Sequence, residues 1–399
     1  MCRVVFRPGW RRLDPEPSVS DAGAAFVTGL RTCFAELRDP RVQGRCDHKL
    51  LDILALALLG TLCGANDWSE IETFGHARED WLRTFLELPN GVPSDDTIRR
   101  VFGLLERQQF ADGLFLWTRA LNAALGGNVI PIDGKTLRHS FRTRAGLGPL
   151  HLVTAWAAES GLTLGQVACE DKSNEITAIP VLLKRLDLKK CTVTIDAMGC
   201  QKEIAAQIIE QKGDYVLGLK GNQPGLEQDM CRLLEAQLES QELPPGSLEH
   251  RAEQTGHGRV ERRIYRTIAI PVNHPQRAVW KGLRTLVVVT SGRTVSGCEA
   301  WETRLYISSH KPNAKKLGTA IRQHWSIENT QHWSLDVTFG EDAQRQQDRN
   351  GAANLAAVRR LALSLLRQDK TNKRGLKNKR FACALDPNYL LTVIANAKF

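Results

Sequence analysis

Two short β-branched runs that each end in an aspartate constrain the fold of this chain more than any other feature. The runs are Val129-Ile130-Pro131-Ile132-Asp133 and Cys191-Thr192-Val193-Thr194-Ile195-Asp196. Short apolar runs of this kind are typical of buried strands in α/β proteins. A carboxylate at the end of such a strand projects into the crevice where these sheets form their sites. We therefore predict that Asp133 and Asp196 meet if their strands are neighbours.

The segments around these runs follow a definite order. Residues 151–158 and 162–168 flank Glu159-Ser160-Gly161, which predicts a β-hairpin. Helical patterns cover 175–186 and 201–211, and a fifth strand is predicted at 214–220. The order strand, strand, strand, helix, strand, helix, strand predicts an α/β fold with a mixed sheet, which is the order of the ribonuclease H-like fold.

The rest of the chain divides around this α/β part. Residues 1–23 are rich in Arg and Pro and predict a disordered N-terminal extension, and residues 24–126 predict an all-helical N-terminal domain. The α/β domain then covers 127–398, with a β-rich insertion at about 225–312 and a long helix from Ala314 to about Val337. From Arg349 we expect a basic helical tail, whose cations form either a solvated face or a phosphate-contacting arm.

Composition narrows the class of partner. Lys and Arg number 54 against 44 Asp and Glu, which leaves a net charge of +10 and favours a polyanion such as nucleic acid. No apolar run is long enough to span a bilayer and no secretory signal is evident, so we expect a cytoplasmic protein without a membrane partner. The phosphate-cradling pattern G-x-x-x-x-G-K-[ST] is missing, so no nucleotide cofactor is expected. None of the ten cysteines has zinc-knuckle spacing.

The paired acids point to a divalent metal. Ionised carboxylates a few ångströms apart repel each other, and a hard cation with oxygen ligands relieves that repulsion. Two such cations can hold the attacking and leaving oxygens of a phosphodiester displacement. For either aspartate alone, the simpler interpretation is a turn residue that ends a strand.

A third acid is expected from the long helix. Glu328 and Asp336 are separated by about 80° and about 12 Å in a regular helix, so they cannot both reach one metal. We prefer Glu328 because it has the longer side chain, with Asp336 as the alternative. His324, Glu328 and His332 also have the spacing of a zinc site on one helix face, but no fourth ligand is evident.

Cations and an amide near these acids are candidate phosphate contacts. Lys135 and Lys220 are preferred because they belong to the same edge of the sheet as the acids. Arg99 and Arg100 are exposed on a predicted helix that begins at Asp95. This helix either reads DNA in a helix-turn-helix or belongs to a helical bundle with a solvated basic face. The complete predicted DNA-binding set is Lys135, Arg138, Lys220, Asn222, Arg99 and Arg100.

Five motifs in this order resemble the DDE-type transposases of bacterial insertion sequences, in the branch of the H-repeat-associated proteins. They are Ile132–Arg138, Asp171–Pro180, Thr194–Lys202, Leu219–Gln223 and His324–Asn329. The resemblance runs from about Phe34 to Ala395. A related, larger transposase group carries Tyr, Arg and Lys around its catalytic Glu. The corresponding positions here are Ile321, His324 and Leu335, so phosphate contacts by those side chains are not implied.

The resemblance implies a ribonuclease H-like catalytic core with a β-rich insertion, a helical N-terminal domain and two Mg²⁺ ions, for which Mn²⁺ can substitute. Asp133 would bridge both ions, Asp196 would hold one and Glu328 the other. The implied activity is metal-dependent cleavage at the ends of an insertion sequence, followed by transfer of the 3′-OH into target DNA. The implied partners are double-stranded DNA and a second copy of the chain in the synaptic complex.

Two other functions stay open from the residues. A plain Mg²⁺ nuclease would cleave without joining and would not need a basic tail. A DNA-binding remnant without catalysis would not need an intact acidic triad. The presence of Asp133, Asp196 and Glu328 argues against the remnant.

Overall fold

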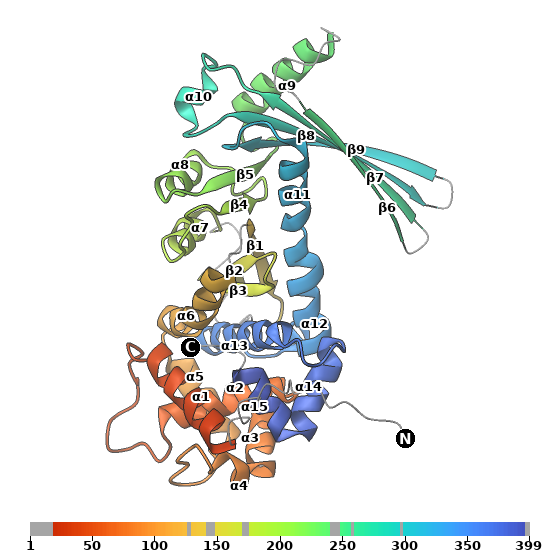
Figure 1. Ribbon diagram of the computed structural model, residues 1–399. Helices are drawn as coiled ribbons and strands as arrows, with labels where there is room; N and C mark the ends of the chain where they lie inside the picture. The colour runs from red at the N-terminus through yellow and green to blue at the C-terminus, as the bar shows by residue number, and fades with distance from the viewer. Residues whose placement is uncertain are drawn as a thin grey trace, which may run out of the picture.

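The computed structural model describes residues 19–125, 129–140, 148–169, 175–239, 248–256, 259–295 and 298–395. Within these ranges the strands are β1 (Val129–Leu137), β2 (Leu150–Ala157), β3 (Leu162–Cys169), β4 (Thr192–Ile195), β5 (Asp214–Leu219), β6 (Leu248–Gly256), β7 (Arg259–Ala269), β8 (Thr285–Val295) and β9 (Cys298–Ser308). They form one sheet in the order β3-β2-β1-β4-β5-β9-β8-β7-β6. Helices gather at one end of this sheet, and β6 to β9 extend from the other (Figure 1).

The half of the sheet from β3 to β5 carries the predicted acids. β1, β4 and β5 run parallel, whereas β2 and β3 form the predicted hairpin and run antiparallel to their neighbours. All four residues of β4, Thr-Val-Thr-Ile, are buried, which is typical of a strand covered on both faces. The predicted mixed α/β sheet is confirmed.

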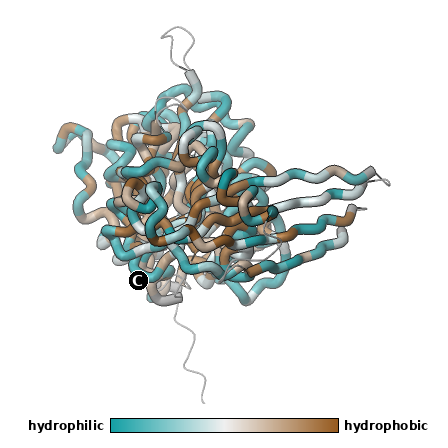
Figure 2. Tube along the Cα trace, turned by 90° about the horizontal axis from the view of Figure 1, so that it is seen from above, coloured by the Kyte–Doolittle hydropathy of each residue, from teal (hydrophilic) through white to brown (hydrophobic). Residues whose placement is uncertain are grey.

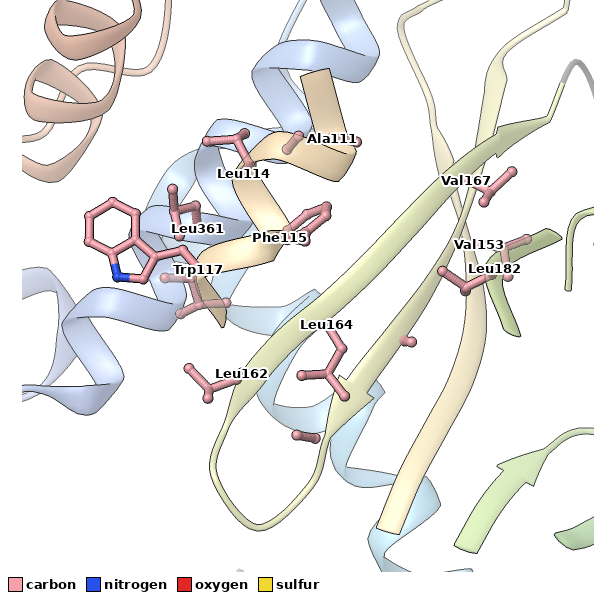
Figure 3. Close-up of a cluster of buried hydrophobic side chains, with 14 of the residues drawn as sticks. Ala111, Leu114, Phe115, Trp117, Val153, Leu162, Leu164, Val167, Leu182 and Leu361 are labelled. Carbon is pink, nitrogen blue, oxygen red and sulfur yellow. The ribbon is translucent and has the colours of Figure 1, made fainter. Parts of the chain in front are cut away.

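Helices cover both faces of this half. α7 (Glu175–Leu183) and α8 (Lys202–Glu210) lie on one side, and α11 (Ala314–His324) runs along the other (Figure 1). α6 (Arg107–Leu125) packs against β3. Figure 3 shows the apolar contacts, with Phe115 of α6 facing β3 and Leu182 of α7 beside Val153 and Val167. The sheet therefore has an apolar core on the side that α7 covers.

The helical part of the fold is drawn from both ends of the chain. α13 (Arg349–Gln368) is its central helix, and every residue from Gly351 to Leu366 is buried. It packs against the earlier helices α2 and α5 as well as α6 and β3. The remaining helices are α1 (Val19–Cys33), α2 (Leu50–Leu62), α3 (Trp68–Ala77), α4 (Glu79–Leu82), α5 (Asp95–Leu104), α14 (Leu376–Leu385) and α15 (Pro387–Ala395).

The expected basic tail is not an appended arm. Lys379 is buried, and its Nζ donates to the carbonyl of Leu366 at 2.9 Å. Arg380 is also buried, and its Nη2 donates to the carbonyl of Thr61 at 2.9 Å. These two cations satisfy backbone carbonyls inside the helical part, which contradicts a phosphate-contacting role for them.

The β-rich insertion continues the main sheet. It comprises α9 (Pro224–Glu239), β6, β7, α10 (Gln276–Val279), β8 and β9, and β9 pairs antiparallel with β5 from Leu305 to Ser308. The outer ends of its strands project beyond the body of the molecule (Figure 2). No helix of the described part of the chain combines the length and hydropathy needed to cross a membrane.

The predicted long helix from Ala314 is interrupted. α11 ends at His324, a π-helical turn covers Ile327–His332, and α12 covers Trp333–Phe339. The backbone N–H of Trp333 donates to the carbonyl of Glu328, five residues earlier, which is the π-helical pattern. We call Ile327–His332 the π turn. The expectation of one regular helix was therefore wrong at the position of the predicted third acid.

Candidate active site

Asp133 and Asp196 lie on neighbouring parallel strands. Ile132 and Ile195 are paired at the end of the ladder between β1 and β4, and each is followed directly by one of the aspartates. β1 itself continues to Leu137 through its pairing with β2. The sequence predicted that Asp133 ends its strand, but the structure places it inside β1. The extra residues of β1 carry the next side chains, including Lys135, into the interior.

Glu328 comes to the same region from the π turn. Burial is the main cause that raises the pKa of Asp133 to about 7. The charges of Glu328, Asp196 and Glu175 raise this pKa further, against a hydrogen bond from the Gly134 backbone N–H. The structure thus brings Glu328 and Asp196 close enough for their charges to act on Asp133.

Carboxylate oxygens are the ligands that a hard divalent cation prefers. Among the described residues, no three His, Cys, Asp or Glu side chains are arranged as a complete metal-binding group. Burial is the main cause of the raised pKa of Asp133, and the further rise caused by the neighbouring carboxylates is a repulsion that a cation with oxygen ligands relieves. The residues that would hold it are Asp133, Asp196 and Glu328.

Two loops brace Asp196. Its Oδ1 accepts hydrogen bonds from the backbone N–H groups of Met198 at 3.1 Å and Gly199 at 3.3 Å. The side-chain amide of Asn222 donates to the carbonyl of Ala197, which belongs to the same loop. Asn222, predicted to contact DNA, therefore supports the loop that carries Asp196. Lys220, on the other hand, is exposed.

Lys135 is engaged by acids instead of being available to a phosphate. Its side chain is 9% exposed, and its Nζ contacts Asp336, Glu341 Oε2 at 3.2 Å and Asp342 Oδ1 at 3.8 Å. This contradicts the predicted DNA contact by Lys135. The same pairing occupies Asp336, the alternative third acid. Arg138 stays 73% exposed, with its Nε 3.3 Å from Asp342 Oδ2.

The acids around Lys135 are part of a buried ion network. Glu341 and Arg360 are both 0% exposed, and Arg360 Nη1 lies 2.7 Å from Glu341 Oε1. Burial by itself raises the pKa of Glu341, but the charges of Arg360, Lys135 and Arg359 lower it to about 2. The network joins β1 to α13 through the short segment after α12.

The two histidines of the predicted zinc alternative have separate partners. His324 Nδ1 is hydrogen-bonded to Thr194 Oγ1 at 3.0 Å, and burial lowers the pKa of His324 to about 4. His332 Nδ1 lies 3.6 Å from Asp133 Oδ2, and burial together with nearby cations lowers the pKa of His332 to about 3. The π turn also breaks the regular spacing between them, so the structure contradicts a zinc site on one helix face.

A buried pair beside Asp133 was missed at the level of sequence. His151 is 2% exposed and Glu175 is 7% exposed, and their side chains contact each other. A Cβ atom at Gly134 would lie 2.3 Å from both Glu175 Oε1 and His151 Nε2, so the pair requires glycine there. Glu175 belongs to one of the five motifs, but residues 171–174 of that motif lie outside the described part of the chain.

An arginine-rich groove lies beside the site, between the insertion and the π turn. Arg304 lies over the ring of Trp325 at 5.0 Å, and Trp301 is 49% exposed. Four arginines and two glutamates line the groove, so its net charge is positive and favours a polyanion. The lining residues come from three strands and the α11 region, which is why no sequence motif marks them. They are Glu261, Arg263, Ser291, Gly292, Arg293, Ala300, Trp301, Glu302, Arg304, Arg322, Trp325 and Asn329.

Arg99 and Arg100 lie on α5, in the helical part of the fold. Ser94 caps this helix by accepting a hydrogen bond from the Thr97 backbone N–H at 3.3 Å. The arginine side chains are 54% and 69% exposed, and both pair with Asp96. Their contact with DNA stays a prediction.

Comparison with known proteins identifies the family. A family model described as "Transposase DDE domain" matches residues 125–365, and one described as "DDE_Tnp_1-associated" matches residues 31–118. This chain belongs to the DDE transposases of bacterial insertion sequences. The family resemblance predicted from the sequence is confirmed. The residues that match the transposase domain, 125–365, include Asp133, Asp196 and Glu328.

Relatives of this transposase extend over nearly the whole chain. It is 41% identical over 374 residues to "Putative transposase YncI" of Escherichia coli O157:H7. These aligned residues cover 93% of this chain and 95% of the relative. It is 38% identical over 365 residues to "H repeat-associated putative transposase YhhI" of Escherichia coli strain K12, with 90% and 96% covered.

One solved structure shows a weak likeness. It is a piggyBac transposase synaptic complex with hairpin DNA, with a TM-score of 0.40 and 10% identity over 94% of this chain and 77% of that chain. A similarity at this level does not establish a shared fold.

Proposed function

We propose that this DNA transposase binds the ends of its insertion sequence, cleaves a strand there in a metal-dependent step and transfers the resulting 3′-OH into target DNA. The observation that carries the proposal is the pairing of β1 with β4, which sets Asp133 beside Asp196. Burial, and after it the charges of Glu328, Asp196 and Glu175, raise the pKa of Asp133, so Glu328 of the π turn acts on the same region. Mutually repelling carboxylates at a sheet crevice are suited to a divalent cation.

The core that presents these acids is proposed to be ribonuclease H-like. The order β3-β2-β1-β4-β5, with β1, β4 and β5 parallel and the hairpin antiparallel, supports this assignment. In this arrangement Asp133 and Asp196 stand side by side because their strands are paired up to the preceding residues. Glu328 then completes the triad from the helix that covers the other face.

Each acid has a distinct proposed task. As the family resemblance implies, Asp133 would be a ligand of both of two Mg²⁺ ions, Asp196 would hold one of them and Glu328 the other. When bound, the two ions would activate the attacking oxygen and stabilise the leaving oxygen of the phosphodiester. The backbone N–H groups of Met198 and Gly199 hold Asp196 Oδ1, so its orientation is fixed before substrate arrives.

The arginine-rich groove is proposed as the path of the DNA strand at this site. Its lining reaches Asn329, the residue after Glu328, so a strand in the groove would pass next to the acids. Arg293 and Arg322 supply charge for phosphates, and the indole faces of Trp301 and Trp325 suit unpaired bases. A second copy of the chain is expected in the active complex because two element ends are joined together.

A strand-transfer assay tests this function. Purified protein is mixed with a labelled duplex that carries the terminal repeat of the element and with supercoiled target DNA, in Mg²⁺ or in EDTA. We expect joined product in Mg²⁺ alone, and its loss in Asp196→Asn and Glu328→Gln. Asp80→Asn, which changes an exposed carboxylate on α4, is the matched control and should join normally.

The outcomes separate the alternatives. Cleavage without joining, in the presence of two ends and a target, would favour a plain nuclease. DNA binding without either reaction would favour a protein that has lost catalysis. Joining that survives EDTA or the loss of Glu328 would overturn the proposed mechanism.

A further inference from the structure

The helix that carries Glu328 is fixed to the sheet on both sides of the π turn. Before the turn, His324 Nδ1 is hydrogen-bonded to Thr194 Oγ1 at 3.0 Å. After the turn, Asp336 is paired with Lys135. Thr194 belongs to β4 and Lys135 to β1, so the two anchors come from the two strands that also carry the aspartates.

The anchors and the acids are closely spaced along each strand. Thr194 is two residues before Asp196, and Lys135 is two residues after Asp133. Asp133 and Lys135 are both in β1, and side chains two residues apart on a strand point to the same face of a sheet. Asp196 follows β4 directly, so Thr194 is held close to it along the chain. Each anchor therefore faces the helix from a position fixed relative to an aspartate.

The π turn is what allows both anchors to form. His324 and Asp336 are 12 residues apart. In a regular α-helix that separation places two side chains about 120° apart around the axis, so they could not both face the sheet. Because a π turn takes up about one extra residue, the offset falls to about 20°.

The geometry has a cost that the anchors offset. Isolated π-helical turns are rare because their hydrogen bonds are less favourable than those of the α-helix. If the contacts on either side are lost, the turn can relax toward a regular helix, which rotates one flank by about 100° relative to the other. A rotation of that size would carry Glu328 away from the aspartates or carry Asp336 away from Lys135.

We propose that the contacts Thr194–His324 and Lys135–Asp336 form a two-point clamp that holds the π turn and sets the position of Glu328 opposite Asp133 and Asp196. The four residues of this clamp are positioning residues, because they act on the reaction through Glu328. The proposal rests on the proposed function, in which Glu328 is a metal ligand. Residues that orient metal ligands typically change metal affinity by 10–100-fold when they are replaced.

The test measures Mn²⁺ binding as well as turnover. Full-length protein in complex with a pre-cleaved element end, without target DNA, is titrated with Mn²⁺, and the free ion is followed by electron paramagnetic resonance. Thr194→Val removes the hydroxyl of one anchor, and Asp336→Asn removes the charge of the other, each with little change in volume. We expect each to weaken Mn²⁺ binding by about 10-fold, whereas Thr194→Ser, which keeps the hydroxyl, should restore most of the affinity.

The chain provides a matched control on the same strand. Thr192 Oγ1 is hydrogen-bonded to His310 Nε2 at 2.9 Å, two residues before Thr194 and outside the clamp. Thr192→Val therefore removes the same kind of Thr–His contact without touching the helix. We expect it to bind Mn²⁺ like the wild type, and thermal melting of all variants reports whether the fold is kept.

The results distinguish failure of the clamp from failure of the proposed function. If Glu328→Gln does not weaken Mn²⁺ binding, its assignment as a ligand is wrong. If Glu328→Gln weakens binding but Thr194→Val and Asp336→Asn do not, the clamp is overturned and the assignment stands. Thr194→Ser binding as poorly as Thr194→Val, or Thr192→Val binding equally poorly, would also overturn the clamp. If Asp336→Asn does not fold, the threonine series decides.

Discussion

The buried ion network around Glu341 leads to a quantitative prediction for Glu341→Gln. Three cations lower the pKa of this carboxyl to about 2, against an ordinary value of 4.5. Because the folded-state pKa is below the unfolded one, the charged form stabilises the fold at pH values above 4.5, and this stabilisation is lost as pH falls toward 2. The difference corresponds to about 3 kcal/mol at pH 7.

A second argument gives a similar magnitude. The side chains of Glu341 and Arg360 are both 0% exposed. If Glu341 is replaced by a neutral residue, the charge of Arg360 is therefore not compensated by hydration. Removal of one partner from a buried ion pair typically costs about 3–5 kcal/mol, because the other charge is left uncompensated. We therefore expect Glu341→Gln to lower the free energy of unfolding by about 3 kcal/mol at pH 7.

Urea denaturation at two pH values tests this reasoning. The difference in free energy of unfolding between wild type and Glu341→Gln should be about 3 kcal/mol at pH 7 and about half of that at pH 3. The double variant Glu341→Leu, Arg360→Met should recover part of the loss, since apolar pairs of similar size replace buried ion pairs well. A loss below about 1 kcal/mol at pH 7, or an equal loss at both pH values, would refute the argument.

Three further predictions follow from the site and the groove. Gly134→Ala should cost about 1–3 kcal/mol and reduce strand cleavage, because its Cβ displaces the contact between His151 and Glu175; an unchanged melting temperature would contradict this. Arg293→Ala should weaken DNA binding by a similar factor for all sequences and reduce the salt dependence of log K by about 1, as measured by fluorescence anisotropy at several salt concentrations. Mn²⁺ should raise the melting temperature of the wild type at pH 8, and its removal with EDTA should reverse the rise, whereas Asp133→Asn should respond to neither.

The pairing of the two aspartates was predictable from sequence because it depends on local patterns. Buried β-branched runs, turn residues and the alternation with helices specify parallel strands, and adjacent parallel strands end at the same edge. The structure pairs Ile132 with Ile195 as this requires. The hairpin and the helix at 175–186, observed as Glu175–Leu183, follow from the same local signals.

The environment of Lys135 was not predictable in the same way. Its partners Asp336, Glu341 and Asp342 lie about 200 residues later, and single-sequence patterns do not report such contacts. The π turn also has no marker in the sequence His-Trp-Ser-Ile-Glu, because it depends on anchors from two strands. The arginine groove was missed for a similar reason, since strands and a helix far apart in the chain assemble it.

The central position of α13 has a consequence for synthesis of the protein. α2 packs against α13, yet Arg349 follows Leu62 by 287 residues. At ordinary bacterial rates a ribosome needs roughly 15–60 s to make that stretch. During this time the part of α2 that packs against α13 has no permanent cover, so the nascent chain depends on chaperones or on temporary contacts. A message truncated before the codon for Arg349 would therefore yield a product that exposes this part of α2 and is readily degraded.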